Sequence, residues 1–364
     1  MKINFRQLKL IDWLLYILPV ILAILGIAII YSLSYYSNIQ LFYNQIIFFV
    51  IAIVAMVVFS FIDYRQLKSA STILYIIGMV LLILVFILGK TTFGATSWID
   101  LGFYDFQPSE FFKLILVIVL STYLCDKIGN LTWKNILIAS LIMIVPVLMV
   151  ALQPDLGTAS IIVLTFLILL FSAKPSKKQI LTFLIIIAVA IPLSWLLLKD
   201  YQRQRLLTFM DPTSDPYGSG YNVSQALIAV GNGGVFGRGF GHGPQSQLNF
   251  LPVAHTDFIF AGIAEAMGFA GSIVLIIFYA VIIIKIVSIA KKAKDNFGML
   301  LAIGIATIIF MHAVINIGMN IGLMPVTGIP LPFISAGGTS LVLMFICIGI
   351  VQSISIRHKK ISFK

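Results

Sequence analysis

The chain consists largely of long apolar runs separated by short polar connections. These runs reach the roughly 20 residues that an α-helix needs to cross a bilayer. Backbone polar groups in lipid must be satisfied within their own segment, so each run predicts a helix. We expect ten membrane-spanning helices, over residues 13–33, 41–62, 73–89, 109–125, 135–152, 158–172, 179–198, 258–285, 298–322 and 338–356.

One long stretch, about residues 199–256, interrupts this pattern. The chain is polar and rich in glycine here, and it returns to an apolar run through His255, Thr256 and Asp257. We interpret the stretch as a large extracytoplasmic loop within a single membrane domain, residues 1–364. The predicted fold is therefore an all-α, polytopic integral membrane protein.

Composition and charge agree with this prediction. The sequence is 60% hydrophobic and only 10% charged, whereas about a quarter of the residues in a soluble domain are charged. The net charge of +11 comes mostly from Lys and Arg in alternate connections, and such basic connections stay in the cytoplasm. We therefore place both termini in the cytoplasm, and the basic excess does not indicate a nucleic-acid partner.

Asp257 is the first candidate for chemistry because it stands at the predicted mouth of the eighth span. An ionisable side chain in that position is costly and marks a functional site by default. Loss of hydration raises the pKa of a carboxyl group toward the range of a general base. The alternative is a helix cap, since Asp is favoured at helix starts, although Thr256 can fill that role equally well.

Charged residues also lie inside predicted spans. Glu110 and Lys113 are three residues apart on neighbouring helix faces, and they form either a structural ion pair or part of the wall of an outward-open cavity. Glu265 lies about 12 Å inside the eighth span, at 1.5 Å per residue. A buried acid needs a partner, and the candidates are Lys113, Asn316 and Asn320.

Charged residues also occur in the connections of the predicted outer side. Asp155 lies in a Pro-Asp-Leu-Gly turn, where it either stabilises the turn or lines a cavity. Arg203 and Arg205 follow the seventh span and would point to one side of an extended chain. Two guanidinium groups at a membrane surface suit a phosphate or diphosphate headgroup, or they contact ordinary anionic lipid.

A glycine-rich run, residues 231–243, superficially resembles a nucleotide-binding loop. It lacks the Lys-Ser/Thr pair of a phosphate-binding loop. We expect its glycines to permit tight turns and a close approach to a substrate. The four histidines of the chain are not grouped as metal ligands would be.

Several long motifs, in order along the whole chain, resemble those of the SEDS family (shape, elongation, division and sporulation). The similarity is closer to the elongation members of that family than to the division members. The matching residues are Phe106-Gln107-Pro108-Ser109-Glu110 with Lys113, Gln153-Pro154-Asp155-Leu156-Gly157, Arg203-Gln204-Arg205, Gln245-Ser246-Gln247-Leu248, His255-Thr256-Asp257-Phe258 and Pro330-Leu331-Pro332-Phe333-Ile334-Ser335.

This resemblance implies a peptidoglycan glycosyltransferase of the bacterial cytoplasmic membrane that serves cell elongation and shape. Its substrate would be lipid II, a disaccharide-peptide on undecaprenyl diphosphate, polymerised on the outer face with inversion at the anomeric carbon. Asp257 would be the general base. The expected substrate-binding residues are Arg203, Arg205, Lys113, Glu110, Asp155, Gln153, Glu265 and Ser335.

The resemblance also implies partners, namely a class B penicillin-binding protein that acts as the transpeptidase and other membrane proteins of the elongation complex. The leaving diphosphate needs positive charge, which the basic residues or a divalent cation, Mg or Mn, could supply. The sequence does not identify the residues that would bind this cation, and no organic cofactor is expected.

Two other functions compete with this hypothesis. A flippase that moves lipid II across the membrane should carry ionisable groups near the midplane, whereas most of them lie at the outer rim here. A scaffold that only anchors a transpeptidase would leave Asp257 and the two arginines without a purpose.

Overall fold

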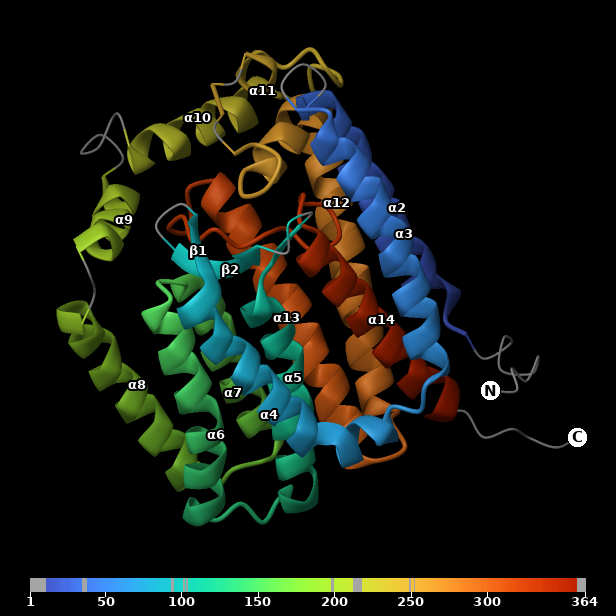
Figure 1. Ribbon diagram of the computed structural model, residues 1–364, viewed down its shortest axis with the longest axis vertical. Helices are drawn as coiled ribbons and strands as arrows, with labels where there is room; N and C mark the ends of the chain where they lie inside the picture. The colour runs from blue at the N-terminus through green and yellow to red at the C-terminus, as the bar shows by residue number, and fades with distance from the viewer. Residues whose placement is uncertain are drawn as a thin grey trace, which may run out of the picture.

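The computed structural model describes residues 11–34, 38–92, 95–100, 102, 104–197, 200–211, 218–248, 250–251 and 253–358. Each predicted span corresponds to one helix, so the prediction of an all-α polytopic fold is confirmed (Figure 1). The ten helices are α2 Trp13–Ser34, α3 Gln40–Phe61, α4 Arg65–Leu88, α5 Pro108–Leu124, α6 Trp133–Leu152, α7 Leu156–Ser172, α8 Lys177–Leu197, α12 Ile259–Lys291, α13 Asn296–Asn320 and α14 Gly338–His358.

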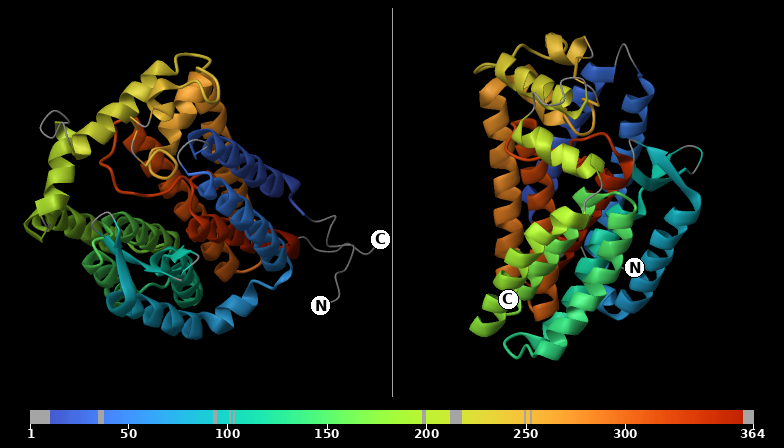
Figure 2. Two further views of the ribbon diagram at one scale, coloured as in Figure 1. Left: turned by 45° about the horizontal axis from the view of Figure 1, so that its top comes forward. Right: turned by 90° about the vertical axis from the view of Figure 1, so that its left-hand side faces the viewer.

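The burial of the helices separates a central group from a lipid-facing group. Within the described residues, eight helices are long and apolar enough to cross a membrane, and α7 is a shorter apolar helix. The apolar windows of α14, α5 and α13 are 94%, 72% and 72% buried, whereas that of α3 is only 17% buried. The most buried helices, α14, α5 and α13, therefore form the centre, and α3, α4 and α6 lie outside them (Figure 2).

A small antiparallel sheet follows α4, and the sequence interpretation missed it. Its strands β1 (Gly89–Thr92), β2 (Ala95–Asp100) and β3 (Asp105–Phe106) pair in the order β1-β2-β3. The sheet lies beyond the end of a span, where water can satisfy its edges, so the rule that lipid permits only helices and closed barrels does not apply to it. The sheet delivers the chain to the start of α5.

The long stretch between α8 and α12 is partly helical. It contains α9 (Asp200–Met210), α10 (Ser219–Asn232) and α11 (Pro244–Gln247), which arch over one end of the bundle (Figure 1). That end also carries the sheet and the connection between α13 and α14. The polar segments that the sequence assigns to the outer side therefore gather at one end of the molecule.

The glycine-rich run supplies hydrogen-bond partners to the backbone of α12 where that helix is interrupted. Gly268 has φ 67° and ψ −166°, which interrupts the helix and frees backbone groups that must find other partners. A Cβ on Gly237 would collide with the Ala266 carbonyl, so only glycine allows the segment to lie this close. The glycines therefore allow the segment to approach α12 closely, whereas the sequence suggested a close approach to a substrate. The bonds that fill the break are Arg238 N–H to Glu265 O, Gly239 N–H to Ala266 O, Phe269 N–H to Gly234 O and Ala270 N–H to Val235 O, at 2.9 to 3.0 Å.

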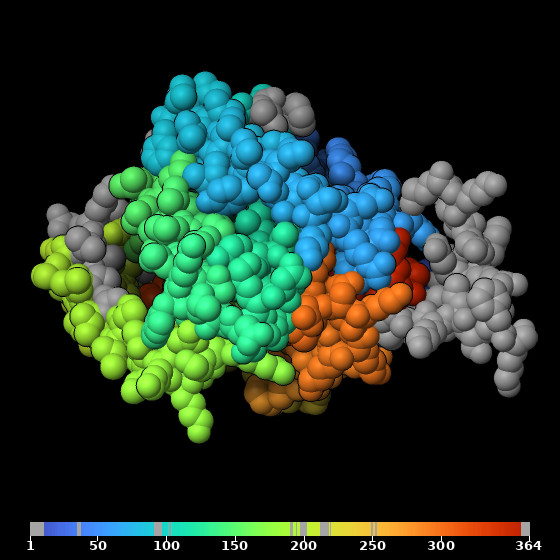
Figure 3. Space-filling view, turned by 90° about the horizontal axis from the view of Figure 1, so that it is seen from below, coloured from blue at the N-terminus to red at the C-terminus, as the bar shows by residue number. Residues whose placement is uncertain are grey.

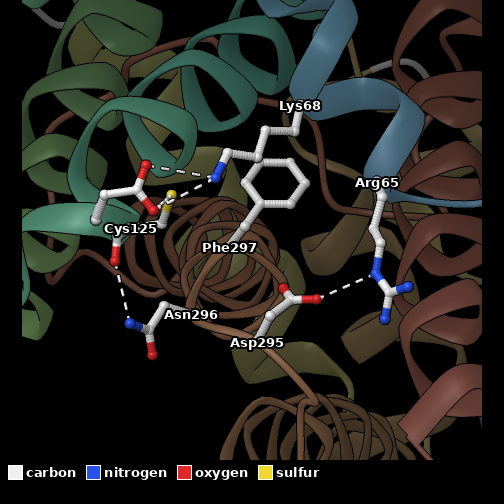
Figure 4. A pocket seen from close by; sticks show the side chains of 7 residues that line it. Arg65, Lys68, Cys125, Asp295, Asn296 and Phe297 are labelled. Atoms are coloured by element: carbon white, nitrogen blue, oxygen red, sulfur yellow. Dashed lines mark hydrogen bonds and ion pairs between the residues drawn. The ribbon is translucent and has the colours of Figure 1, made fainter.

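The opposite end of the bundle is formed by short turns. Seen from there, α4 in blue, α6 in green and the α12–α13 turn in orange lie side by side (Figure 3). A pocket of about 480 Å³ opens at this end (Figure 4). Its charged side chains already pair with one another, Arg65 with Asp295 at 3.3 Å and Lys68 with Asp126 at 3.4 Å.

Candidate active site

The backbone around Asp257 is held by other parts of the chain at three consecutive carbonyl groups. The His255 carbonyl accepts from the Ala336 N–H at 2.9 Å, and the Thr256 carbonyl accepts from the Ser335 hydroxyl at 2.7 Å. The Asp257 carbonyl accepts from two side-chain amides of α13, at 2.9 and 3.0 Å. A segment fixed at three successive peptides presents its side chain in one defined position, which a catalytic group requires.

The alternative interpretation of Asp257 as a helix cap is wrong. The residue before the first turn of α12 is Phe258, and no side chain of its own segment caps the helix. Instead, the Asn320 side-chain oxygen accepts from the Ala261 N–H at 3.0 Å. The Asp257 carboxylate is left to face the connection between α13 and α14, where a Cβ on Gly328 would lie 3.7 Å from its Oδ2.

The surroundings of Asp257 suit a base that works near neutral pH. Burial raises the pKa of its carboxyl group to about 6, although the charge of Arg205 and a bond from Thr256 act in the opposite direction. A general base is most effective when its pKa lies near the working pH. Asp257 therefore combines a fixed position with a useful proton affinity.

A second polar group lies inside the bundle. The Lys113 ammonium is 2.6 Å from Glu110 Oε1 and 2.6 Å from His312 Nε2, and all three side chains are buried. His312 Nδ1 lies 3.1 Å from the Pro330 carbonyl. Because an ammonium only donates, Nε2 accepts from Lys113 and Nδ1 carries the hydrogen that it donates to Pro330. Sequence reasoning missed His312, since nothing marks a lone histidine in an apolar helix as the neighbour of a lysine 199 residues away.

Asp155 and Gln153 join the helices near this group. Asp155 caps α7 by accepting from the Thr158 N–H at 3.0 Å, and it also accepts from Gln107 at 3.1 Å. Burial raises the pKa of its carboxyl group, and the bonds from Thr158 and the charge of Lys113 lower it. Gln153 is buried and donates to the Leu82 carbonyl at 3.0 Å. Asp155 thus joins the start of α7 to the start of α5, and Gln153 joins the end of α6 to α4.

The two arginines do not lie on one side of an extended chain, as the sequence suggested. They belong to helix α9, where residues two apart point to different faces. Arg203 donates to the carbonyls of Trp195 and Leu196 at 3.3 Å. Arg205 donates to the Val326 carbonyl at 3.5 Å, and its charge is the one felt by Asp257. Arg205 is therefore joined to the Asp257 site through its charge and through its bond to the loop between α13 and α14.

One other expectation, the partners of Glu265, needs correction. Glu265 is fully buried and does not contact Lys113, Asn316 or Asn320; its carboxylate accepts from the Gln245 and Ser246 N–H groups at 2.9 and 3.0 Å. A carboxylate at a helix start is favourable, so Glu265 anchors α11 to α12.

Ser335 likewise faces inward. Its oxygen accepts from the Leu331 N–H at 2.8 Å while it donates to Thr256. Ser335 thus joins the connection between α13 and α14 to the Asp257 segment.

The described residues contain no group of three or more His, Cys, Asp or Glu side chains that could hold a metal ion. Mg²⁺ is often bound by one or two carboxylates together with substrate phosphates. Such binding needs fewer protein ligands than a site built entirely by the protein. The described part of the chain therefore does not build a metal centre by itself.

The fold and site define a polytopic membrane protein with a fixed carboxylate and a buried ion pair near one membrane surface. The chain belongs to the FtsW/RodA/SpoVE family of cell cycle proteins, which it matches over residues 12–360. The peptidoglycan glycosyltransferase MrdB of Escherichia coli (strain K12) is 41% identical over 311 residues, 85% of this chain and 84% of MrdB. Stage V sporulation protein E of Bacillus subtilis is 36% identical over 94% of this chain and 96% of its own length.

Solved structures agree with this membership. A chain from a peptidoglycan synthase complex that coordinates polymerization and crosslinking has a TM-score of 0.84 and 28% identity, covering 96% of this chain and 98% of its own. The rod shape determining protein RodA of Thermus thermophilus has a TM-score of 0.71 and 25% identity, covering 95% and 96%. The chain is thus a multi-pass protein of the cytoplasmic membrane.

Proposed function

We propose that this protein is a peptidoglycan glycosyltransferase that polymerises lipid II on the outer face of the cytoplasmic membrane, for cell elongation and shape. The observation that carries the proposal is the Asp257 segment, whose backbone is held at three consecutive carbonyls. Its carboxyl group feels the charge of Arg205, and burial raises its pKa to about 6. Relatives named as peptidoglycan glycosyltransferases supply the reaction class.

In the proposed reaction, a sugar hydroxyl of the acceptor attacks the anomeric carbon of the donor. The hydroxyl proton passes to the Asp257 carboxylate, a new glycosidic C–O bond forms, and the bond between the anomeric carbon and the diphosphate breaks. Undecaprenyl diphosphate leaves with the bonding electron pair. Attack opposite the leaving group inverts the anomeric carbon, and a diphosphate needs no separate carboxylic acid to protonate it.

The leaving diphosphate carries the charge that the site must stabilise. Arg205 is the arginine whose charge lowers the pKa of the base, and a guanidinium suits bidentate contact with phosphate oxygens. A divalent cation, Mg or Mn, would act together with the diphosphate rather than on protein ligands alone. No organic cofactor is proposed.

The proposed partners are a class B penicillin-binding protein and other membrane proteins of the elongation complex. The peptidoglycan synthase complex that this chain resembles, in which polymerization is coordinated with crosslinking, supports such an arrangement. The acceptor chain and the transpeptidase would both approach the end that carries α9, α10 and α11.

Lipid II flipping is the competing function, and the buried Glu110–Lys113 pair is the observation that favours it, because charged residues inside spans mark transport pathways. Lys113 is only five residues beyond the first residue of α5, or about 8 Å at 1.5 Å per residue. The pair therefore lies nearer the outer end than the midplane, where transporters place their sites.

The proposal is tested with purified protein and its transpeptidase partner, by measuring glycan polymer formed from lipid II. Wild type and Asp295→Asn are expected to form polymer, because Asp295 starts α13 at the other end of the bundle and Asn can replace it as a cap. Lipid II translocation in liposomes without any polymer would instead establish the flippase.

A further inference from the structure

Helix α13 carries three buried polar side chains on one face. His312, Asn316 and Asn320 are spaced four residues apart, and residues at that spacing lie above one another on a helix. All three side chains are fully buried. We call these three residues the α13 stripe.

Every member of the stripe bonds to backbone groups of the site, and the two asparagines share the Asp257 carbonyl. Asn320 donates to the Asp257 carbonyl at 2.9 Å, and its oxygen accepts from the Ala261 N–H at 3.0 Å. Asn316 donates to the carbonyls of Asp257 at 3.0 Å and Ile329 at 2.8 Å. The stripe thus joins the start of α12 to the connection between α13 and α14.

His312 continues the same row toward the inside of the bundle. It accepts from Lys113 at 2.6 Å and donates to the Pro330 carbonyl at 3.1 Å. Ile329 and Pro330 are adjacent, so Asn316 and His312 hold neighbouring peptides of one segment. That segment also contains Gly328, which faces the Asp257 carboxylate.

Buried polar groups of this kind are costly unless every one of them is satisfied. An apolar residue at each position would pack in a membrane helix without that requirement. The side chains of the stripe donate their hydrogen bonds to carbonyls of the Asp257 segment and of the loop that faces it. Its arrangement matches what a positioned catalytic group needs from its supporting residues.

We propose that the α13 stripe positions the Asp257 carboxylate by holding the backbone of its own segment and of the loop that faces it. The stripe residues are positioning residues, because they touch the Asp257 backbone and the facing loop and leave the carboxylate free. This inference rests on the proposed function for its kinetic consequence, whereas its structural consequence can be measured without catalysis.

The first test compares Asn320→Leu with Gln352→Leu. Gln352 is also a fully buried amide, and it bonds Asp12 at the opposite end of the bundle, at 3.0 Å. Both variants lose buried hydrogen bonds, so both are expected to be less stable. Only Asn320→Leu should lower kcat, by about 100-fold, with the KM for lipid II changed less than twofold, because a 1 Å misplacement costs about that much.

The second test separates the two bonds of His312. Asn places its amide near the position of Nδ1 and can still donate to Pro330, whereas Gln places its oxygen near Nε2 and can still accept from Lys113. His312→Asn should retain most of the wild-type kcat because the facing loop stays in place. His312→Gln should lose it. If Asn320→Leu does not fold, the kcat values of His312→Asn and His312→Gln provide the kinetic test.

The third test is amide hydrogen exchange in the intact membrane protein. Exchange at Ala261 should accelerate at least tenfold in Asn320→Leu and stay at the wild-type rate in Gln352→Leu. Unchanged exchange at Ala261, or a kcat that falls equally in Asn320→Leu and Gln352→Leu, overturns the inference. If wild type makes no polymer, the proposed function fails, and the exchange rates still decide whether the stripe holds this segment.

Discussion

The charge of Arg205 should set the pH at which the enzyme loses activity. A base must be deprotonated to act, so activity is present above the pKa of Asp257, about 6, and falls as the pH drops through it. Arg205 lowers that pKa because a positive neighbour favours the carboxylate. Replacing Arg205 with Gln should therefore move the acid limb of the kcat profile to higher pH.

The size of the effect follows from the titration of one group. With a pKa of about 6, roughly one eleventh of the Asp257 side chains are ionised at pH 5, so kcat should be about tenfold below its plateau. A tenfold rise in the proton affinity of Asp257 corresponds to about 1.4 kcal/mol and would cost another factor of about ten at pH 5. At pH 8 the two proteins should have similar fractions of ionised base.

The assay is the initial rate of polymer formation at saturating lipid II from pH 5 to pH 9, so that weaker binding does not disturb the profile. Arg203→Gln is the matched control, because Arg203 bonds the carbonyls of Trp195 and Leu196. His255 is a titratable group of the same segment, with a pKa lowered by burial, and His255→Asn should keep the acid limb. An Arg205→Gln profile identical to that of Arg203→Gln would refute the reasoning.

Three further outcomes are expected. Glu110→Gln should lower the free energy of unfolding by about 3–5 kcal/mol, because it leaves Lys113 charged and buried without its carboxylate; denaturation in detergent measures this, and a loss under 1 kcal/mol would contradict it. Gly237→Ala should lower the melting temperature more than Gly231→Ala, since only the former meets a carbonyl of α12; equal melting temperatures would contradict the packing. Calorimetric titration of Mn²⁺ into protein without substrate should show no stoichiometric tight site, whereas one bound ion per chain would show a metal centre built by the protein.

The membrane helices could be predicted from the sequence because one strong constraint governs them. Apolar runs of sufficient length have no alternative to a helix in lipid, and the ten predicted spans all became helices. Segments outside the membrane lack that constraint. The pairing of β1 with β2 and the helix around Arg203 and Arg205 were therefore missed.

The candidate site was only partly predictable for a different reason. Asp257 could be recognised because a carboxyl group at the mouth of a span is rare and costly. The predicted partners of Glu265 were wrong. Its actual partners are backbone N–H groups of α11, which almost any residue type supplies, so no side chain in the sequence marks them. His312 was missed because its contact with Lys113 depends on how α5 and α13 pack.

The central claim is that Asp257 is the base, and the rate of Asp257→Asn tests it most directly. Asn keeps the shape of the side chain, and the bonds to Ala336, Ser335 and the two asparagines use backbone carbonyls that the substitution leaves in place. At saturating lipid II and pH 8, we expect a kcat about 10²–10⁴-fold below wild type, the usual contribution of a general base, with lipid II still bound. Polymer formation by Asp257→Asn at the wild-type rate would contradict it.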